Sequence, residues 1–390
     1  MPLNILISGG GIAGPALAFW LHRHGHTVTI VEQASAMRGG GQAVDFRGPS
    51  MAVLEKMGVL GRVRADATNM GAASVVDERG NTVARIPVEV FSGELEIVWG
   101  DLARILHDAV RGNVECRFGT RITGLDNGEE RVRVAFSDGT AGTYDLVIGA
   151  DGLHSGLRAL VFGPEERFVA HLGQYFCYFD MENRLKIDHG GAFLETPGRT
   201  VGLQATDPDQ PARAMLYMTA PDLVFDHRDT SGNRRLFAEK FAGLGWETPN
   251  ILRALATAEP VYFDSIAQVR LSDYSRNRTA LIGDAAWCAS PRSGMGTSLA
   301  IVAAYVLAHE LRAAHEDHQI AFARYQQLLE PYVARCQELA IASLKADSPT
   351  GVLGRAARRL ARHALRIPPV SRFVAKKSLA VGRSFVLPTY

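Results

Sequence analysis

The chain has 390 residues, of which 47% are hydrophobic and 21% are charged, and its formal net charge is +1. That composition is typical of a globular protein with a large core, and the balanced charge argues against a nucleic-acid-binding protein. The four cysteines are scattered without a CxxC pair or metal-ligand spacing, so we expect neither disulfides nor a metal site. Without a secretory leader or a run of about 18 apolar residues, the sequence predicts a cytoplasmic protein with no membrane span.

The N-terminal elements alternate between strand and helix patterns. Residues 3–8 form a short apolar run that enters a glycine-rich turn over residues 9–14. A helical pattern over residues 15–21 and a second apolar run over residues 27–31 follow, and that run ends at Glu32. A strand, a tight turn, a helix and a second strand ending in an acid form the unit that binds dinucleotides.

Each residue of the turn has a physical reason in that unit. Gly9 turns the chain where a side chain would clash, Gly11 lets the backbone approach a pyrophosphate, and Gly14 lets the helix pack on the strand. Ile12 and Ala13 stand where the helix begins, so that N–H groups and the positive end of the helix dipole face the phosphates. We therefore predict a dinucleotide site at this turn.

Glu32 bears on which dinucleotide binds. It lies 18 residues after Gly14, at the end of the second strand, where its carboxylate can accept a hydrogen bond from a ribose hydroxyl. A carboxylate would repel the 2′-phosphate of NADP, so Glu32 favours FAD or NAD at this site.

The rest of the chain is interpreted from its periodicity. Residues 73–96 alternate with a period of two around a turn at residues 78–81, which predicts a hairpin, and Asp138-Gly139 marks another turn. Further predicted strands cover residues 114–118, 131–136, 144–148 and 279–282, and predicted helices cover residues 49–57, 101–110, 234–242, 294–311 and 319–347. Short strand-like pieces dominate residues 166–274, which favours a β-rich substrate domain.

The C-terminal residues 351–390 contain nine Lys or Arg residues and no Asp or Glu. A surface helix with its basic residues outward and its apolar residues inward explains this pattern better than a membrane-surface or nucleic-acid patch.

Three further motifs occur in the chain. They are residues 149–158, which include Asp151 and Gly152, residues 281–297, which include Asp284, Pro291, Gly294 and Gly296, and the pair Arg38 and Asp45 seven residues apart. Together with the glycine turn, they resemble the class A flavoprotein monooxygenases, the FAD-dependent aromatic hydroxylases. That family includes para-hydroxybenzoate hydroxylase, polyketide hydroxylases and the tetracycline-inactivating monooxygenases. The resemblance extends from residue 3 to about residue 311.

The resemblance implies a role for each matched residue. The glycine turn and Glu32 would hold the ADP half of FAD, Asp151 would lie near the pyrophosphate, and Asp284 would bond ribityl or ribose hydroxyls. Pro291, Gly294 and Gly296 would line the isoalloxazine ring. The implied cofactor-binding residues are Gly9, Gly11, Ile12, Ala13, Gly14, Glu32, Arg38, Asp45, Arg104, Asp151, Asp284, Pro291, Gly294 and Gly296.

Two of these assignments come from shorter matches. Arg38 and Asp45 resemble an arginine and an acid that tetracycline-inactivating members use for the nicotinamide cofactor and the flavin. Arg104 resembles the arginine of a flavin-contacting helix, within one residue of register. The chain departs from the family at Trp99, where many members have Arg, at Trp287 instead of His, and at Ser298 instead of Asn.

The resemblance also implies the fold and its division. We expect an α/β protein with a Rossmann-like FAD-binding domain built on a parallel sheet, an inserted, mostly antiparallel β-sheet substrate domain, and C-terminal helices. The expected FAD-binding segments are residues 1–72, 97–165 and 275–320, the expected substrate-domain segments are residues 73–96 and 166–274, and the C-terminal helices occupy residues 321–390.

The expected activity follows from the same family. NAD(P)H would reduce FAD, and a flavin hydroperoxide formed with O2 would hydroxylate an aromatic or polycyclic, polyketide-like small molecule. The sequence identifies no catalytic base, and we expect a monomer or a homodimer. Two alternatives stay open: a Baeyer–Villiger oxygenase or FAD-dependent dehydrogenase on the same scaffold, and a non-catalytic, flavin-bound protein that sequesters a ligand.

Overall fold

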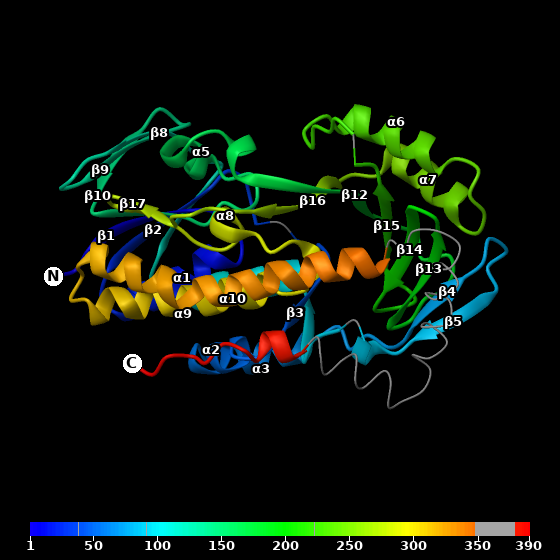
Figure 1. Cartoon of the computed structure of the whole chain (residues 1–390), viewed down its shortest axis with the longest axis horizontal. Helices are drawn as coiled ribbons and strands as arrows, with labels where there is room; N and C mark the ends of the chain where they lie inside the picture. The colour runs from blue at the N-terminus through cyan, green and yellow to red at the C-terminus, as the bar shows by residue number, and fades with distance from the viewer. Residues whose placement is uncertain (38, 91, 222, 348–378) are drawn as a thin grey trace.

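The computed structural model describes residues 1–37, 39–90, 92–221, 223–347 and 379–390. Two sheet-based parts lie along the long axis of the molecule, and the long strands β12 and β16 run from one part into the other (Figure 1). Helices α9 and α10 extend along the same axis. The two parts therefore share a continuous framework.

The N-terminal part is built on a six-stranded sheet with the order β17-β18-β11-β1-β2-β7. Its strands are β1 (Asn4–Ser8), β2 (Thr27–Glu32), β7 (Glu115–Phe118), β11 (Leu146–Gly149), β17 (Ser275–Arg276) and β18 (Thr279–Leu281). All neighbours pair in parallel except β17 with β18. The central strands are buried on both faces, as expected where helices cover a parallel sheet.

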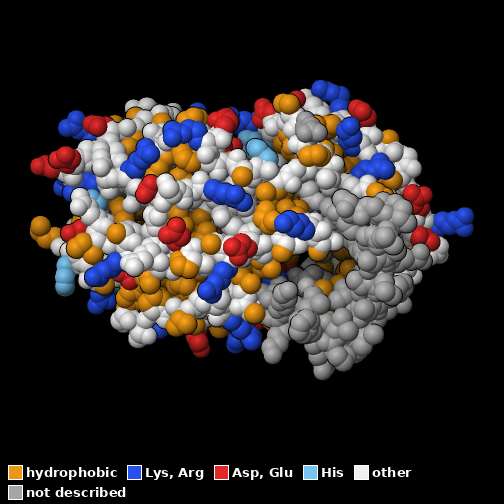
Figure 2. Space-filling model, viewed as in Figure 1, with side chains coloured by type: hydrophobic (Ala, Val, Ile, Leu, Met, Phe, Trp, Pro, Cys, Tyr) orange, Lys and Arg blue, Asp and Glu red, His pale blue; other side chains and the backbone are white. Residues whose placement is uncertain are grey.

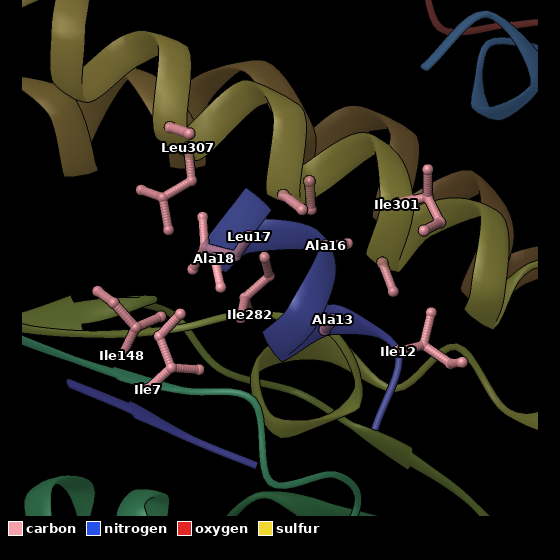
Figure 3. Packing of buried hydrophobic residues seen from close by; sticks show 14 of the residues in the cluster. Ile7, Ile12, Ala13, Ala16, Leu17, Ala18, Ile148, Ile282, Ile301 and Leu307 are labelled. Carbon is pink, nitrogen blue, oxygen red and sulfur yellow. The ribbon is translucent and has the colours of Figure 1, made fainter. Parts of the chain in front are cut away.

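Helix α1 (Ala13–Arg23) lies between this sheet and helix α9 (Gly296–Ala313). Figure 3 shows Ile7 and Ile148 on the sheet side of α1 and Ile301 and Leu307 on the α9 side. All four of these side chains are almost completely buried, so the hydrophobic effect fixes α1 and the turn that precedes it.

The second part is built on a seven-stranded sheet with the order β16-β12-β15-β14-β13-β4-β5. Its strands are β4 (Ala73–Val76), β5 (Thr82–Ile86), β12 (Val169–Met181), β13 (Gly190–Thr196), β14 (Arg199–Ala205), β15 (Ala212–Thr219) and β16 (Val261–Val269). Every pair is antiparallel except β13 with β4.

The two faces of this sheet carry different side chains, because successive residues of a strand point to opposite faces. Helices α6 (Thr230–Phe241) and α7 (Thr248–Thr257) cover one face and share a core with Tyr175 and Cys177 of β12. The opposite face carries Phe176, Tyr178, Phe193 and Tyr217, which we call the aromatic face.

Smaller elements complete the fold. The remaining strands are β3 (Ala43–Phe46), which pairs with β6 (Leu95–Val98), and β8 (Ile122–Asn127), β9 (Val132–Phe136) and β10 (Ala141–Tyr144), which form a three-stranded sheet. Other helices of the described residues are α2 (Ser50–Lys56), α3 (Leu60–Ala65), α4 (Trp99–Val110), α5 (Gly156–Phe162), α8 (Asp284–Trp287), α10 (His318–Asp347) and the 3-10 turns η1 (Val88–Val90), η2 (Glu165–Arg167) and η3 (Pro291–Ser293).

The predicted fold class is confirmed, with corrections in detail. The expected strand over residues 144–148 is two strands, because Tyr144 ends β10 and a new strand, β11, begins at Leu146 in a different sheet. Strand β8 and helix α7 were not predicted. The domain boundaries stay a prediction, and the expected basic surface helix falls largely on residues 348–378, outside the described residues.

Two general properties of the described residues bear on function. None of their helices combines the length and apolarity that crossing a membrane requires. Lys and Arg side chains are interspersed with Asp and Glu over the described surface in Figure 2.

Candidate flavin site

The glycine turn after β1 is shaped by close backbone contacts. A Cβ atom on Gly9 would lie 2.4 Å from the Ala150 carbonyl oxygen, and one on Gly14 would lie 2.0 Å from the Gly9 carbonyl oxygen. Gly9 also has a φ of 114°, which favours glycine. The protein's own packing therefore requires both residues.

Gly11 has a different environment. A Cβ atom there would meet a Trp99 ring atom at 3.4 Å, which is an ordinary van der Waals distance. The apoprotein should therefore tolerate a small side chain at position 11. The N-terminal end of α1 follows at Ala13, with Ile12 as its N-cap residue and no side-chain cap. A turn with this space beside an uncapped helix start fits a bound pyrophosphate.

Glu32 lies beside the turn at the end of β2. Its carboxylate accepts one hydrogen bond from the Gly10 N–H at 2.8 Å and another from the Ala34 N–H at 2.8 Å. These backbone donors fix the orientation of the carboxylate, whose remaining lone pairs can accept ribose hydroxyls.

Helix α4 presents a histidine to the same turn, which the sequence analysis missed. The buried His107 places Nε2 2.6 Å from the Gly10 carbonyl oxygen. The position of His107 on the apolar side of an amphipathic helix was the available signal. Arg104 points elsewhere: its side chain is 45% exposed, and its guanidinium pairs with Asp66 at 2.8 Å and Asp101 at 3.1 Å, so the structure does not bring it to the turn.

Trp99, at the start of α4, is a second residue that sequence reasoning left outside the site. Its ring lies against Gly11, and a Cβ atom on Gly41 would lie 3.2 Å from the Trp99 Cβ atom and 3.7 Å from the ring atom Cε3. Its backbone N–H donates to the Gln42 carbonyl oxygen at 3.0 Å. Trp99 therefore connects the glycine turn to the loop before β3.

Asp284 follows β18 at the carboxyl end of the parallel strands. Its side chain is exposed, although β18 before it and residues Ala285 to Trp287 after it are buried. A Cβ atom on Gly296, the first residue of α9, would lie 3.7 Å from Asp284 Oδ1. An open carboxylate between buried elements fits a ligand with hydroxyl groups, and carboxyl ends of parallel strands are where such sheets bind ligands.

Asp45 and Gly294 are brought together from distant parts of the chain. Asp45 accepts a hydrogen bond from the Gly93 N–H at 2.6 Å, and its other carboxylate oxygen lies 3.4 Å from Arg47 Nη2. A Cβ atom on Gly294 would lie 3.3 Å from Arg47 Nη2 and 3.5 Å from Asp45 Oδ2. Gly294 has a φ of 61°, in the left-handed region. Burial raises the pKa of Asp45, which the Arg47 charge opposes.

The other predicted residues are placed as follows. Asp151 is engaged within its own loop, where it accepts hydrogen bonds from the Leu157 N–H at 2.9 Å and from the Ser155 hydroxyl. Its loop still borders the turn, because Ala150 contacts Gly9. Pro291 begins η3 and is exposed. Arg38 lies outside the described residues.

The site residues therefore converge from separate segments at one edge of the six-stranded sheet. Comparison with known proteins identifies the family of the chain. A family profile described as an FAD binding domain matches residues 3–346. This chain belongs to that FAD-binding family. The predicted family is thus confirmed, and with it the prediction of FAD as the cofactor.

Several proteins similar to this FAD-binding chain are named flavin-dependent monooxygenases. It is 38% identical over 352 residues to an uncharacterized Mycobacterium tuberculosis protein, with 89% of this chain and 95% of that protein covered. It is 35% identical over 343 residues to a flavin-dependent monooxygenase of Legionella longbeachae, with 87% and 88% covered. The structure of the tetracycline destructase Tet(51) matches with a TM-score of 0.88 and 33% identity, and both chains are fully covered at 100%. The chain is therefore an enzyme of the flavoprotein monooxygenase type.

Proposed function

We propose that this flavoprotein uses NAD(P)H and O2 to hydroxylate an aromatic or polycyclic, polyketide-like small molecule. The observation that carries the proposal is the placement of the aromatic face next to the loop that contains η3, where Arg292 contacts Gln174 and Tyr217 of the sheet. A planar substrate on that face would lie beside the loop that we assign to the isoalloxazine ring. The flavin-dependent monooxygenases among the similar proteins support this class of reaction, and the tetracycline destructase supports a polycyclic substrate.

The chain's own residues would hold the cofactor by familiar interactions. When bound, FAD supplies the electron-transfer and oxygen-activating chemistry. The glycine turn and the N-terminal end of α1 would bind the pyrophosphate, Glu32 the adenosine ribose, and Asp284 the ribityl hydroxyls. The N-terminal end of α9, at Gly296, would stabilise negative charge on an isoalloxazine ring bound beside it.

The aromatic face would position the substrate and keep water away. Phe176 and Tyr178 are buried, with ring centroids 4.8 Å apart, and Phe193 packs against the same cluster. Exclusion of water protects an activated oxygen group from unproductive release as peroxide. A phenol or enol substrate supplies its own nucleophilic carbon, so the proposal assigns no protein nucleophile and no catalytic base.

The decisive experiment measures substrate-stimulated NAD(P)H oxidation together with product mass. The FAD-loaded protein is mixed with NADH or NADPH and a panel of phenols and polycyclic enols, under air and under nitrogen. The proposal predicts oxygen-dependent stimulation by at least one compound, with a product that gains one oxygen atom on a ring carbon. Oxygen inserted into a carbon–carbon bond would indicate a Baeyer–Villiger oxygenase, and turnover under nitrogen with an added acceptor would indicate a dehydrogenase. Tight binding of a compound that does not stimulate NAD(P)H oxidation would indicate a protein that sequesters a ligand.

The role of Asp284 gives a separate prediction. Replacing Asp284 with Ala should remove hydrogen bonds to the ribityl chain and weaken FAD binding by about tenfold to a hundredfold. FAD titration of the apoprotein, followed by flavin fluorescence, measures the change. Asp209→Ala is the matched control, because that carboxylate is 81% exposed and pairs with Lys186 in the other part of the molecule. Unchanged FAD affinity in Asp284→Ala would show that this acid does not hold the cofactor.

A further inference from the structure

Trp99 begins helix α4 beside the glycine turn, and the loop before β3 holds its backbone in place. Its N–H donates to the Gln42 carbonyl oxygen at 3.0 Å, and the Gly100 N–H donates to the Gly40 carbonyl oxygen at 2.7 Å. A Cβ atom on Gly100 would lie 2.5 Å from the Gly40 nitrogen, so the loop and the helix are in direct backbone contact. The Trp99 side chain therefore extends from a fixed position.

The indole ring of Trp99 lies between this loop and the glycine turn. The ring atom Cε3 is on the side of Gly41, whereas the ring atom Cζ2 is the one that a Cβ atom on Gly11 would meet. In an indole, Cζ2 is bonded to the carbon that carries Nε1, and Cε3 lies on the opposite edge. The Nε1 side of the indole, rather than the Cε3 side, is therefore the side near Gly11.

The indole N–H of Trp99 is available to a ligand. The ring is half-buried at the border of the main hydrophobic core. Among the residues that the structure describes, no side chain or carbonyl group accepts a hydrogen bond from Nε1. An indole N–H donates and cannot accept, and it normally has a partner when it is covered. A ligand that covers this edge would therefore have to present an acceptor.

The pyrophosphate of FAD presents such acceptors beside Gly11. We propose that Trp99 is an FAD-binding residue whose indole N–H donates a hydrogen bond to the pyrophosphate. This inference rests on the FAD site of the proposed function and is independent of the substrate. Trp99 stands where many class A monooxygenases have an arginine, so this chain would contact the pyrophosphate with a neutral donor instead of a charge. A tryptophan that serves packing alone would use only its ring.

Paired substitutions separate the N–H from the ring. Trp99→Phe keeps an aromatic ring and removes the donor, so it should weaken FAD binding by about tenfold, because a hydrogen bond to an anionic oxygen is lost. Trp246→Phe makes the same change beside Gly80, in the other part of the molecule, and should leave FAD affinity unchanged. Titration of each apoprotein with FAD, followed by flavin fluorescence, measures the affinity. The melting temperature of each apoprotein shows whether the fold is intact.

A third variant exchanges the neutral donor for a charged one. Trp99→Arg should bind FAD more tightly than Trp99→Phe at low salt, because a guanidinium also donates to phosphate oxygens. Its FAD affinity should fall more steeply with sodium chloride than that of the wild-type chain, since salt screens the added charge. A ring needed only for packing would not be replaced by arginine.

A spectroscopic measurement follows the indole N–H itself. The wild-type protein is produced with ¹⁵N-labelled tryptophan, and the signal that is absent from Trp99→Phe or Trp99→Arg identifies Trp99. Saturating FAD should move the Trp99 indole proton to lower field and slow its exchange with water, because a hydrogen bond to an anionic oxygen has both effects. The Trp246 indole signal should change little.

The possible outcomes are distinct. An FAD affinity of Trp99→Phe equal to that of the wild-type chain would overturn the proposal. So would a Trp99 indole signal that saturating FAD leaves in place. Failure of the FAD site itself would look different, because the wild-type apoprotein would then take up no FAD in either measurement.

Discussion

At the scale of single residues, the glycines of the N-terminal turn should respond differently to the same substitution. Gly14→Ala places a methyl group 2.0 Å from a backbone oxygen, so it should destabilise the apoprotein by about 2–3 kcal/mol. Gly11→Ala meets only a ring atom at 3.4 Å. It should leave the stability of the apoprotein within about 0.5 kcal/mol and weaken FAD binding by about tenfold, because the methyl group occupies the path of the pyrophosphate.

Urea unfolding of the apoprotein and FAD titration distinguish the two effects. Each glycine variant serves as the control for the other, since they differ by three positions in one turn. If Gly11→Ala destabilises the apoprotein and leaves FAD affinity intact, the ligand does not approach the turn from that side.

Individual site residues were predictable where the backbone pattern alone determines their place. Gly9, Gly14 and Glu32 lie at fixed positions of a strand-turn-helix-strand unit, so sequence spacing locates them. The placement of Arg104 depends on which side of α4 faces the turn, and the acids Asp66 and Asp101 attract it to the surface instead. Arg292 contacts a sheet more than a hundred residues earlier in the chain, and no local pattern signals such a contact.

At the scale of elements, a charged cluster joins the two parts of the molecule. His154, in the loop before α5, places Nδ1 2.8 Å from Glu165 of η2 and Nε2 3.3 Å from Asp264 of β16. Its ring stacks on His227 at a centroid distance of 3.7 Å. Burial lowers the pKa of His154, but the hydrogen bonds and charges of Asp264 and Glu165 outweigh that effect and raise it to about 9.

This cluster predicts a loss of stability at alkaline pH. Because the pKa of His154 is higher in the folded chain than its ordinary 6.5, its stabilising contribution is complete below that pH and disappears as the pH rises through about 9. Allowing for partial exposure, the contribution is roughly 2 kcal/mol. Urea unfolding between neutral and alkaline pH should therefore show a fall that His154→Gln lacks.

The exposed His22 provides the control for this pH profile. His22→Gln should reproduce the wild-type fall in unfolding free energy, because that side chain lies at the solvent-exposed end of α1. A pH profile of His154→Gln that matches the wild type would show that other groups determine the alkaline transition.

The C-terminal residues 379–390 form another connection between elements. Gly382 is buried against Arg47, and its carbonyl oxygen accepts a hydrogen bond from Tyr332 at 3.2 Å. Phe385 stacks on Tyr332 with ring centroids 5.2 Å apart. This segment therefore packs against Arg47. Because Arg47 contacts Asp45 and lies beside Gly294, the segment also supports the contact between those two residues.

Replacing Phe385 tests whether the C-terminal segment stabilises the fold. Phe385→Ala should lower the unfolding free energy by about 1–3 kcal/mol, because it removes a stacked, partly buried ring. Val386→Ala, at a side chain that is 85% exposed, should change it by less than about 0.5 kcal/mol. Equal melting temperatures for the two variants would show that the C-terminal segment does not stabilise the fold.

Helices and strands were predictable where the local sequence shows a clear periodicity of apolar residues. The strands and helices of the N-terminal unit carry clear periodicity, and so do α9 and α10. Strand β8 lacks a strong alternation of buried and exposed residues, and helix α7 begins within the stretch Trp246-Glu247-Thr248-Pro249, which resembles a loop. Strand β8 is fixed by its pairing with the next strand, β9, and helix α7 packs against α6 and β12.

At the scale of the whole molecule, the cofactor should stabilise the fold, because its predicted contacts come from segments that are distant in the sequence. Saturating the apoprotein with FAD at about 100 times its dissociation constant should raise the unfolding free energy by about 2.7 kcal/mol. Thermal unfolding with and without FAD measures this effect. Riboflavin, which lacks the ADP half that the glycine turn and Glu32 would bind, should stabilise the chain much less.

The most direct test of the account is the absorbance spectrum of the purified chain after incubation with FAD and removal of the excess. The account predicts a yellow protein that retains a single FAD per chain and releases it intact on denaturation, since the site offers non-covalent contacts. A colourless protein that takes up no FAD would contradict the assignment of the site and every functional conclusion built on it.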